Sequence, residues 1–302
     1  MQKMQQAIDL VEGGCVFSDG CSDAVQAWDA AAAVMVGARE GTDGNNSASG
    51  SYGKSVYGLA DKRCPQYGTC GPNGGIDKSK PATINSKILA YFAEGQQATY
   101  AGIVSQMKEA KRSISEKSSV PFLQGTLRYA WKQSTANSGG DVSDKTVGEG
   151  AAFSVGVTAK LWACSTKGYN KAFRQMQVGG NFSGKRTIDF NAVKLAFECN
   201  YRCMGVTCAE VGDFIDGNPI DSPKVRTCND DENGSSAGLA KGCKRGTNKA
   251  RRQVCRKFTG RPGIEGRDDF GYIADAASAP APTDAPVAAP TPVAPLPTND
   301  SD

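Results

Sequence analysis

The side chains of this sequence that could do chemistry are mainly oxygen donors, because the chain contains no histidine. Histidine is the usual general base near neutral pH and a common ligand of transition metals. Its absence excludes a Ser-His-Asp triad, a Cys-His pair and histidine-based zinc or haem sites. Paired carboxylates remain able to hydrolyse glycosides, but no spacing in the sequence identifies such a pair. We therefore expect a protein that binds a ligand and is not an enzyme.

Tyrosines and carboxylates together form the richest set of donors. Phenolate and carboxylate oxygens are hard ligands that suit a hard cation such as Fe³⁺. Arginine can hold an anion bidentately beside such a metal, and Arg63 and Arg128 are candidates for that role. For any one donor, a packed tyrosine or a surface carboxylate is the alternative interpretation. The candidate donors are Tyr52, Tyr57, Asp61, Tyr91, Glu94, Tyr129, Glu149 and Tyr201.

Eleven cysteines indicate an oxidising compartment, where disulfides persist. Short spacings favour the pairs Cys15–Cys21, Cys64–Cys70 and Cys203–Cys208. Four glycosylation sequons point to the same compartment, so we expect an extracellular or periplasmic glycoprotein, or one at the cell surface. The sequons begin at Asn45, Asn181, Asn233 and Asn299.

The ends of the chain and its apolar runs bear on membrane association. The first six residues carry no apolar signal core, so we expect that a signal peptide has been removed or that the chain is a fragment. The longest apolar stretch, residues 30–38, is too short to cross a bilayer. We expect no membrane span.

Apolar residues at helical spacing predict a mainly α fold, a helical bundle stapled by disulfides. Two segment types recur in the same order: a small-residue helix led by Asp29 or Glu149, then a helix led by Asn85 or Asn191. This order indicates a duplicated helical hairpin, with chance similarity between Ala-rich helices as the alternative. The predicted helices cover residues 22–37, 83–98, 102–116, 121–132, 146–163 and 189–204.

Composition divides the chain into three parts. We expect the helical domain to cover residues 1–215. Residues 216–275 form a polar, irregular, Cys-bearing segment, with a basic cluster at 241–257. This cluster either binds anionic polysaccharide or is a solvated loop; it lacks interleaved aromatics, so no nucleic acid is expected. Residues 276–302 are a Pro/Ala-rich, disordered stalk without a core.

Four strings in the helical part carry a family resemblance. In this order, they resemble the algal iron-assimilating proteins, secreted proteins induced by high CO₂ or iron deficiency and related to the phytotransferrins of marine algae. The resemblance covers roughly residues 22–213 and leaves the tail outside. It rests on the ordered series, which is Ala27-Trp28-Asp29-Ala30-Ala31, Leu59-Ala60-Asp61-Lys62-Arg63-Cys64, Gln124-Gly125-Thr126-Leu127-Arg128-Tyr129-Ala130 and Glu149-Gly150-Ala151-Ala152-Phe153.

The resemblance implies a ferric-iron binding protein outside the cytoplasm that supports iron uptake under iron limitation, with carbonate as a candidate synergistic anion. Asp29 and Glu149 hold equivalent places in the proposed repeat, before apolar helices where an unpaired carboxylate would be costly to bury, which predicts that both face one central site. Among the matched positions, the candidate metal ligands are Asp29, Asp61, Tyr129 and Glu149, and the candidate anion-binding or orienting residues are Arg63, Gln124 and Arg128.

The expected partners are iron and either a membrane uptake receptor or a cell-wall polysaccharide. The alternative function is a cell-wall or surface structural protein that binds anionic polysaccharide, which the basic cluster, the sequons and the stalk favour. A hydrolase that acts through paired carboxylates is the third hypothesis.

Overall fold

The structure is a computed structural model that describes residues 1–37, 55–134, 140–177 and 188–215. These residues contain helices and isolated β-bridges but no strand, which confirms the predicted mainly α, disulfide-stapled fold. The elements are α1 (Gln2–Glu12), the short 3₁₀ helix η1 (Phe17–Asp19), α2 (Asp23–Val36), α3 (Val56–Tyr67), α4 (Thr83–Tyr100), α5 (Val104–Lys117), α6 (Val120–Lys132), α7 (Asp144–Cys164), α8 (Thr166–Met176), α10 (Phe190–Glu198), α11 (Tyr201–Met204) and α12 (Cys208–Val211).

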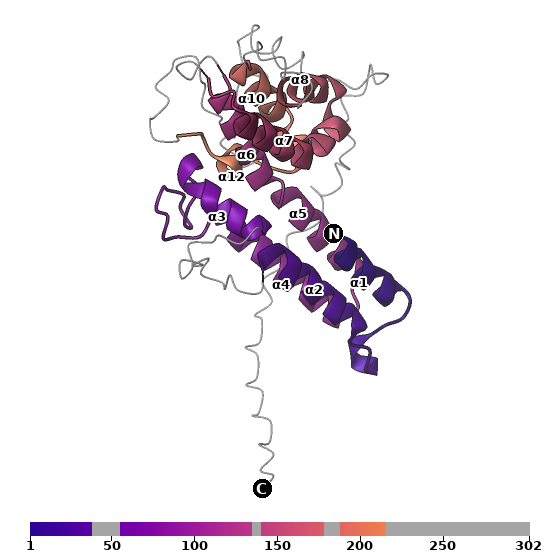
Figure 1. The fold of residues 1–302 in the computed structure, drawn as a ribbon. Helices are drawn as coiled ribbons and strands as arrows, with labels where there is room; N and C mark the ends of the chain where they lie inside the picture. The colour runs from indigo at the N-terminus through magenta and orange to yellow at the C-terminus, as the bar shows by residue number, and fades with distance from the viewer. Residues whose placement is uncertain (38–54, 135–139, 178–187, 216–302) are drawn as a thin grey trace, which may run out of the picture. The chain divides into compact units, whose positions relative to one another are not determined.

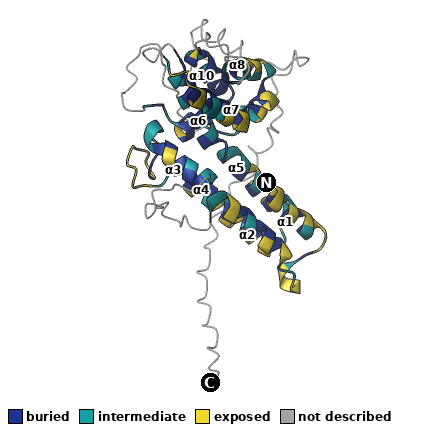
Figure 2. Cartoon of the chain, in the orientation of Figure 1, coloured by how far each residue is buried: buried dark blue, intermediate teal, exposed yellow. Residues whose placement is uncertain are grey.

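The helices α1, α2, α4 and α5 pack against one another as a bundle (Figure 1). On α1, the side chains of Met4, Ala7, Ile8 and Val11 are buried. Their spacing of i, i+3, i+4 and i+7 places them along one face of the helix. The outer faces of α1 and α2 are exposed (Figure 2). The helix α1 therefore packs into the bundle through a narrow apolar stripe on an otherwise polar helix.

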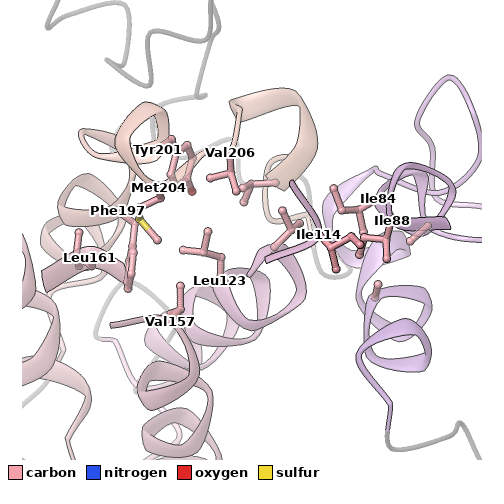
Figure 3. Packing of buried hydrophobic residues seen from close by; sticks show 14 of the residues in the cluster. Ile84, Ile88, Ile114, Leu123, Val157, Leu161, Phe197, Tyr201, Met204 and Val206 are labelled. Atoms are coloured by element: carbon pink, nitrogen blue, oxygen red, sulfur yellow. The ribbon is translucent and has the colours of Figure 1, made fainter. Parts of the chain in front are cut away.

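A second group of helices is built around α6 and α7. The helix α7 packs on α6 and α8, and α10 packs on α6 and α8. Both α3 and α12 contact α6, so residues distant in the sequence meet there. Buried Ile84, Ile88 and Ile114 belong to the same cluster as the buried side chains of this second group (Figure 3). One continuous core therefore holds the described helices together.

Helix boundaries differ from the prediction mainly near the end of the described residues. The sequence pattern predicts one helix over 189–204, but α10 ends at Glu198 and α11 begins at Tyr201. Asn200 has φ −123° and ψ 3°, and its side-chain amide donates to the Ala196 carbonyl. This local hydrogen bond competes with the helical ladder, as is typical of asparagine. The helices α1, α3, α8 and α12 lie outside the predicted ranges.

The described cysteines form disulfides, and the bonds at Cys15, Cys64 and Cys203 test the spacing-based prediction. Cys15–Cys21 and Cys64–Cys70 are confirmed. The predicted pair Cys203–Cys208 is wrong, because Cys203 bonds to Cys164 with the two Cα atoms 5.7 Å apart. The short helix α11 packs against α7, so tertiary packing brings Cys203 to the last residue of that helix. Cys199 and Cys208 are also disulfide-bonded.

Several predicted features lie outside the described residues. They include the four sequons, the basic cluster at 241–257 and the Pro/Ala-rich segment at 276–302. The duplicated hairpin stays a prediction. Across the described ranges, no helix combines the length and the apolar character needed to cross a membrane.

Candidate metal and anion site

Three of the four strings that carry the resemblance meet at Tyr129. The hydroxyl of Tyr129, on α6, donates a hydrogen bond to the carboxylate of Glu149, on α7. Phe153 lies one turn after Glu149 and stacks on the Tyr129 ring, with the ring centroids 5.5 Å apart and the planes 14° from parallel. From α3, the Arg63 guanidinium lies 5.3 Å from the centre of the Phe153 ring. We call Arg63, Arg128, Tyr129, Glu149 and Phe153 the Tyr129 cluster.

Glycines allow α6 and α7 to approach closely enough to form this cluster. A Cβ atom on Gly125 would lie 2.5 Å from Cδ1 of Phe153. A Cβ atom on Gly150 would lie 3.0 Å from Cβ of Tyr129 and 2.6 Å from the side-chain nitrogen of Gln133. Larger residues at either position would force the helices or the rings apart.

Cations surround the Tyr129 ring. The guanidinium carbons of Arg63 and Arg128 lie 5.9 and 5.3 Å from its centroid, and the Lys132 ammonium lies 5.8 Å away. These distances are within the range of cation–π attraction. The carboxylate of Glu149, which accepts the hydrogen bond from the Tyr129 hydroxyl, brings negative charge to the same place. The immediate surroundings of the ring are therefore rich in positive charge.

Arg63 is the most buried of these cations. Its side chain is only 4% exposed, and its Nη1 atom donates to the Gln66 side-chain oxygen at 2.9 Å. Its Nε atom is buried with no hydrogen-bond partner among the described residues. A buried donor without a partner carries the full cost of its desolvation, so this N–H group is a natural point of attachment for an acceptor.

The buried environment changes the pKa values of two members of the cluster. Burial, together with the hydrogen bond and negative charge of Glu149, raises the pKa of Tyr129, although Arg63 and Arg128 oppose this shift. Burial and the positive charge of Arg128 lower the pKa of Arg63. The Tyr129 phenol therefore keeps its proton at neutral pH.

Asp61 and Gln124, both predicted as site residues, make structural contacts next to the cluster. The Asp61 carboxylate accepts hydrogen bonds from the Ala82 backbone and the Asn85 side chain, both at 2.7 Å, which hold α3 against the start of α4. Gln124 is buried and donates to the Val211 carbonyl at 2.9 Å, which holds α12 against α6. The side chains of Asp61 and Gln124 therefore hydrogen-bond to groups other than Tyr129 and Glu149.

The structure does not bring Asp29 and Glu149 together. Asp29 is exposed on α2, where its carboxylate accepts a hydrogen bond from Gln96 of α4 at 2.6 Å. Glu149 lies on α7, which packs on α6 and α8. The equivalence of the two positions in sequence does not carry over to their positions in space, because each helix packs within a different group.

Sequence reasoning missed two neighbours of Tyr129. Phe153 ends one of the resembling strings, and its spacing from Glu149 places both on one face of α7. Lys132 follows Arg128 by four residues on α6, which likewise places both on one side of the helix. Helical spacing was the signal available for both.

Within the described ranges, no three His, Cys, Asp or Glu residues are grouped so as to hold a metal ion. A metal at this place would therefore need the Tyr129 oxygen and further ligands of other types besides the Glu149 carboxylate. Comparison with protein-family models, with curated proteins and with solved structures finds no match to this chain.

Proposed function

We propose that this protein captures ferric iron outside the cytoplasm and that Tyr129 and Glu149 are two of its ligands. The observation that supports this proposal is the hydrogen bond between the Tyr129 hydroxyl and the Glu149 carboxylate. It brings two hard oxygen donors from different helices within reach of one ion, and Fe³⁺ favours such donors. The disulfides accord with an oxidising compartment.

The hydroxyl proton that Tyr129 shares with Glu149 makes iron binding depend on pH. Fe³⁺ takes the place of the hydroxyl proton of Tyr129, so each ion bound releases that proton. Because the pKa of Tyr129 is raised, the proton competes with the metal. Iron affinity therefore falls as the pH falls.

The surrounding cations make a bound anion necessary. Arg63, Arg128 and Lys132 lie near the Tyr129 ring and repel a trivalent cation. A small oxyanion such as carbonate offsets this repulsion and contributes further oxygen ligands. Arg63 offers it the unpartnered Nε donor. In this proposal iron and the anion bind together.

Titration of the purified chain with a weak ferric chelate, with and without bicarbonate, tests the proposal. Tyrosinate ligation gives a visible charge-transfer band, which we expect only when both iron and bicarbonate are present. Tyr129→Phe should abolish the band and weaken binding at least about 100-fold. Tyr169→Phe is the matched control, because Tyr169 stacks on Phe173 of α8 outside the cluster. A band that survives in Tyr129→Phe would contradict the assignment.

A further inference from the structure

Exposed apolar side chains gather where α1 turns into α2. Phe17 is 45% exposed, Tyr100 43% and Ile103 40%. The rings of Phe17 and Tyr100 meet edge to face, with centroids 4.7 Å apart. Ile103 lies three residues beyond Tyr100, in the short turn between α4 and α5, and its N–H donates to the Ala98 carbonyl. We call Phe17, Tyr100 and Ile103 the tip patch; its η1 turn is among the exposed parts of the bundle (Figure 2).

The tip patch stands on a fixed backbone. Phe17 begins η1 inside the loop closed by the Cys15–Cys21 disulfide. The Val16 carbonyl accepts hydrogen bonds from the N–H groups of Asp19 and Cys21. Gly20 ends the turn at φ 85°, a conformation that favours glycine. An aromatic ring held outward in this way loses little conformational freedom when a partner binds, which favours recognition.

Acidic residues lie beside this apolar surface. Residues 4–37 contain five carboxylates and no lysine or arginine. Glu12 is paired with Lys108 of α5 at 2.6 Å, which leaves Asp19 and Asp23 as the acidic residues closest to Phe17 in the chain. Such a surface is repelled by anionic lipid and attracts positively charged groups.

We infer that the tip patch is a docking surface for a basic polypeptide segment in which an apolar side chain is flanked by lysine or arginine. The apolar side chain packs against Phe17 and Tyr100, and the flanking cations lie near Asp19 and Asp23. Aromatic residues of this kind commonly dominate the binding energy of protein interfaces. The inference is independent of the iron proposal, because it uses none of the residues of the Tyr129 cluster.

Fluorescence anisotropy with a labelled synthetic peptide of leucine and lysine, titrated with the full chain, tests the inference. We expect the Phe17→Ser/Tyr100→Ser variant to bind at least about tenfold more weakly than the wild type. Asp19→Asn/Asp23→Asn should also weaken binding and flatten its salt dependence. Val34→Ser is the matched control, because Val34 is 76% exposed on α2 and should leave binding unchanged. Phe17→Ser alone serves if the double variant does not fold.

Three results would overturn the inference. The first is no binding of the wild-type chain to the peptide, and the second is equal binding by wild type and Phe17→Ser. The third is a loss in Val34→Ser as large as that in Phe17→Ser, which would mean general adhesion to apolar surface. A parallel titration with phosphatidylserine vesicles separates the lipid alternative: vesicle binding that Phe17→Ser abolishes would reassign the surface to membranes.

Discussion

Gly95 on α4 lies against the indole of Trp28 on α2. A Cβ atom built on Gly95 would sit 1.9 Å from Cζ2 of Trp28. The indole is almost fully buried, and its N–H donates to the Phe92 carbonyl at 2.9 Å. The two helices can pack at this distance only because position 95 has no side chain.

Gly95→Ala should therefore destabilise the protein, although alanine is the better helix former. We expect a loss of about 1–3 kcal/mol in the free energy of unfolding, because the ring must shift or the helices must separate. Urea unfolding followed by circular dichroism measures it. Gly148→Ala is the control: apart from the neighbouring backbone of its own helix, no atom lies within 4 Å of its added Cβ, so a gain of about 0.5–1 kcal/mol is expected. Equal effects of the two substitutions would contradict the packing argument.

A buried carboxylate fastens the last described helix to the bundle. Glu210 of α12 accepts hydrogen bonds from Lys87 of α4 at 2.8 Å and from Lys117 of α5 at 3.0 Å. Burial alone would raise the pKa of Glu210, but the two lysines outweigh it and hold the pKa below its ordinary value. The folded state therefore favours the charged form.

It follows that the Glu210 contribution to stability is complete above the ordinary glutamate pKa and is lost as the pH falls from there through the lowered pKa of the folded state. We expect Glu210→Gln to cost about 1–3 kcal/mol at pH 7, and the difference from wild type to shrink towards pH 4. Unfolding by urea at both pH values gives the two differences. Glu109→Gln should change stability by less than about 0.5 kcal/mol, because Glu109 pairs with Arg112 on the exposed side of α5. A pH-independent loss in Glu210→Gln would refute the linkage.

The phenol of Tyr129 should ionise at a lower pH when the Glu149 carboxylate is removed. Glu149 raises the pKa of Tyr129 through its hydrogen bond and its charge, in addition to the effect of burial. Glu149→Gln should therefore lower the Tyr129 pKa, and the ultraviolet absorbance of phenolate, titrated in the iron-free protein, reports the shift. Subtraction of the Tyr129→Phe titration isolates this tyrosine. An unchanged midpoint would show that Glu149 does not act on the phenol.

The two disulfide loops of different length should differ in their effect on stability. Cys164 and Cys203 are 39 residues apart, whereas Cys15 and Cys21 are 6 apart. Chain entropy predicts a loss of about 4 kcal/mol for the Cys164→Ser/Cys203→Ser variant and about 2.4 kcal/mol for Cys15→Ser/Cys21→Ser. Thermal and urea unfolding of the two variants rank them. The opposite order would mean that strain or residual structure, and not loop length, governs the effect.

Helix positions could be predicted where a segment carries its own apolar stripe. The stripe of Ile84, Ile88 and Phe92 defines α4, and Pro121 in the first turn marks the start of α6. The missed helix α1 carries such a stripe too, in Met4, Ala7, Ile8 and Val11. The missed helix α3 carries a weaker local signal: it contains Pro65 and has arginine and cysteine among its buried residues. Its helical state depends on packing against α4 and α6, which no local pattern records.

The candidate site, like the helices, could be predicted from the sequence only in part. The residue types at Tyr129, Glu149, Arg63 and Arg128 were sufficient to nominate them as oxygen donors and anion-binding groups. The contact between these residues depends on Gly125 and Gly150, which let α6 and α7 approach closely. This role of the glycines can be recognised only once the two helices are known to pack against each other. Asp29 was grouped with Glu149 because their surroundings in sequence are alike, but the two helices pack in different places. Similar segments need not occupy similar surroundings.

The bond between Cys164 and Cys203 also bears on how the protein survives proteolysis. It closes a covalent ring that contains α8 and α10. A protease that cuts the backbone once between these cysteines leaves two fragments still joined through sulfur. Such a nicked chain migrates as a single species on a denaturing gel and separates only after a reducing agent is added. A single cleavage in this part of the chain therefore does not release either half.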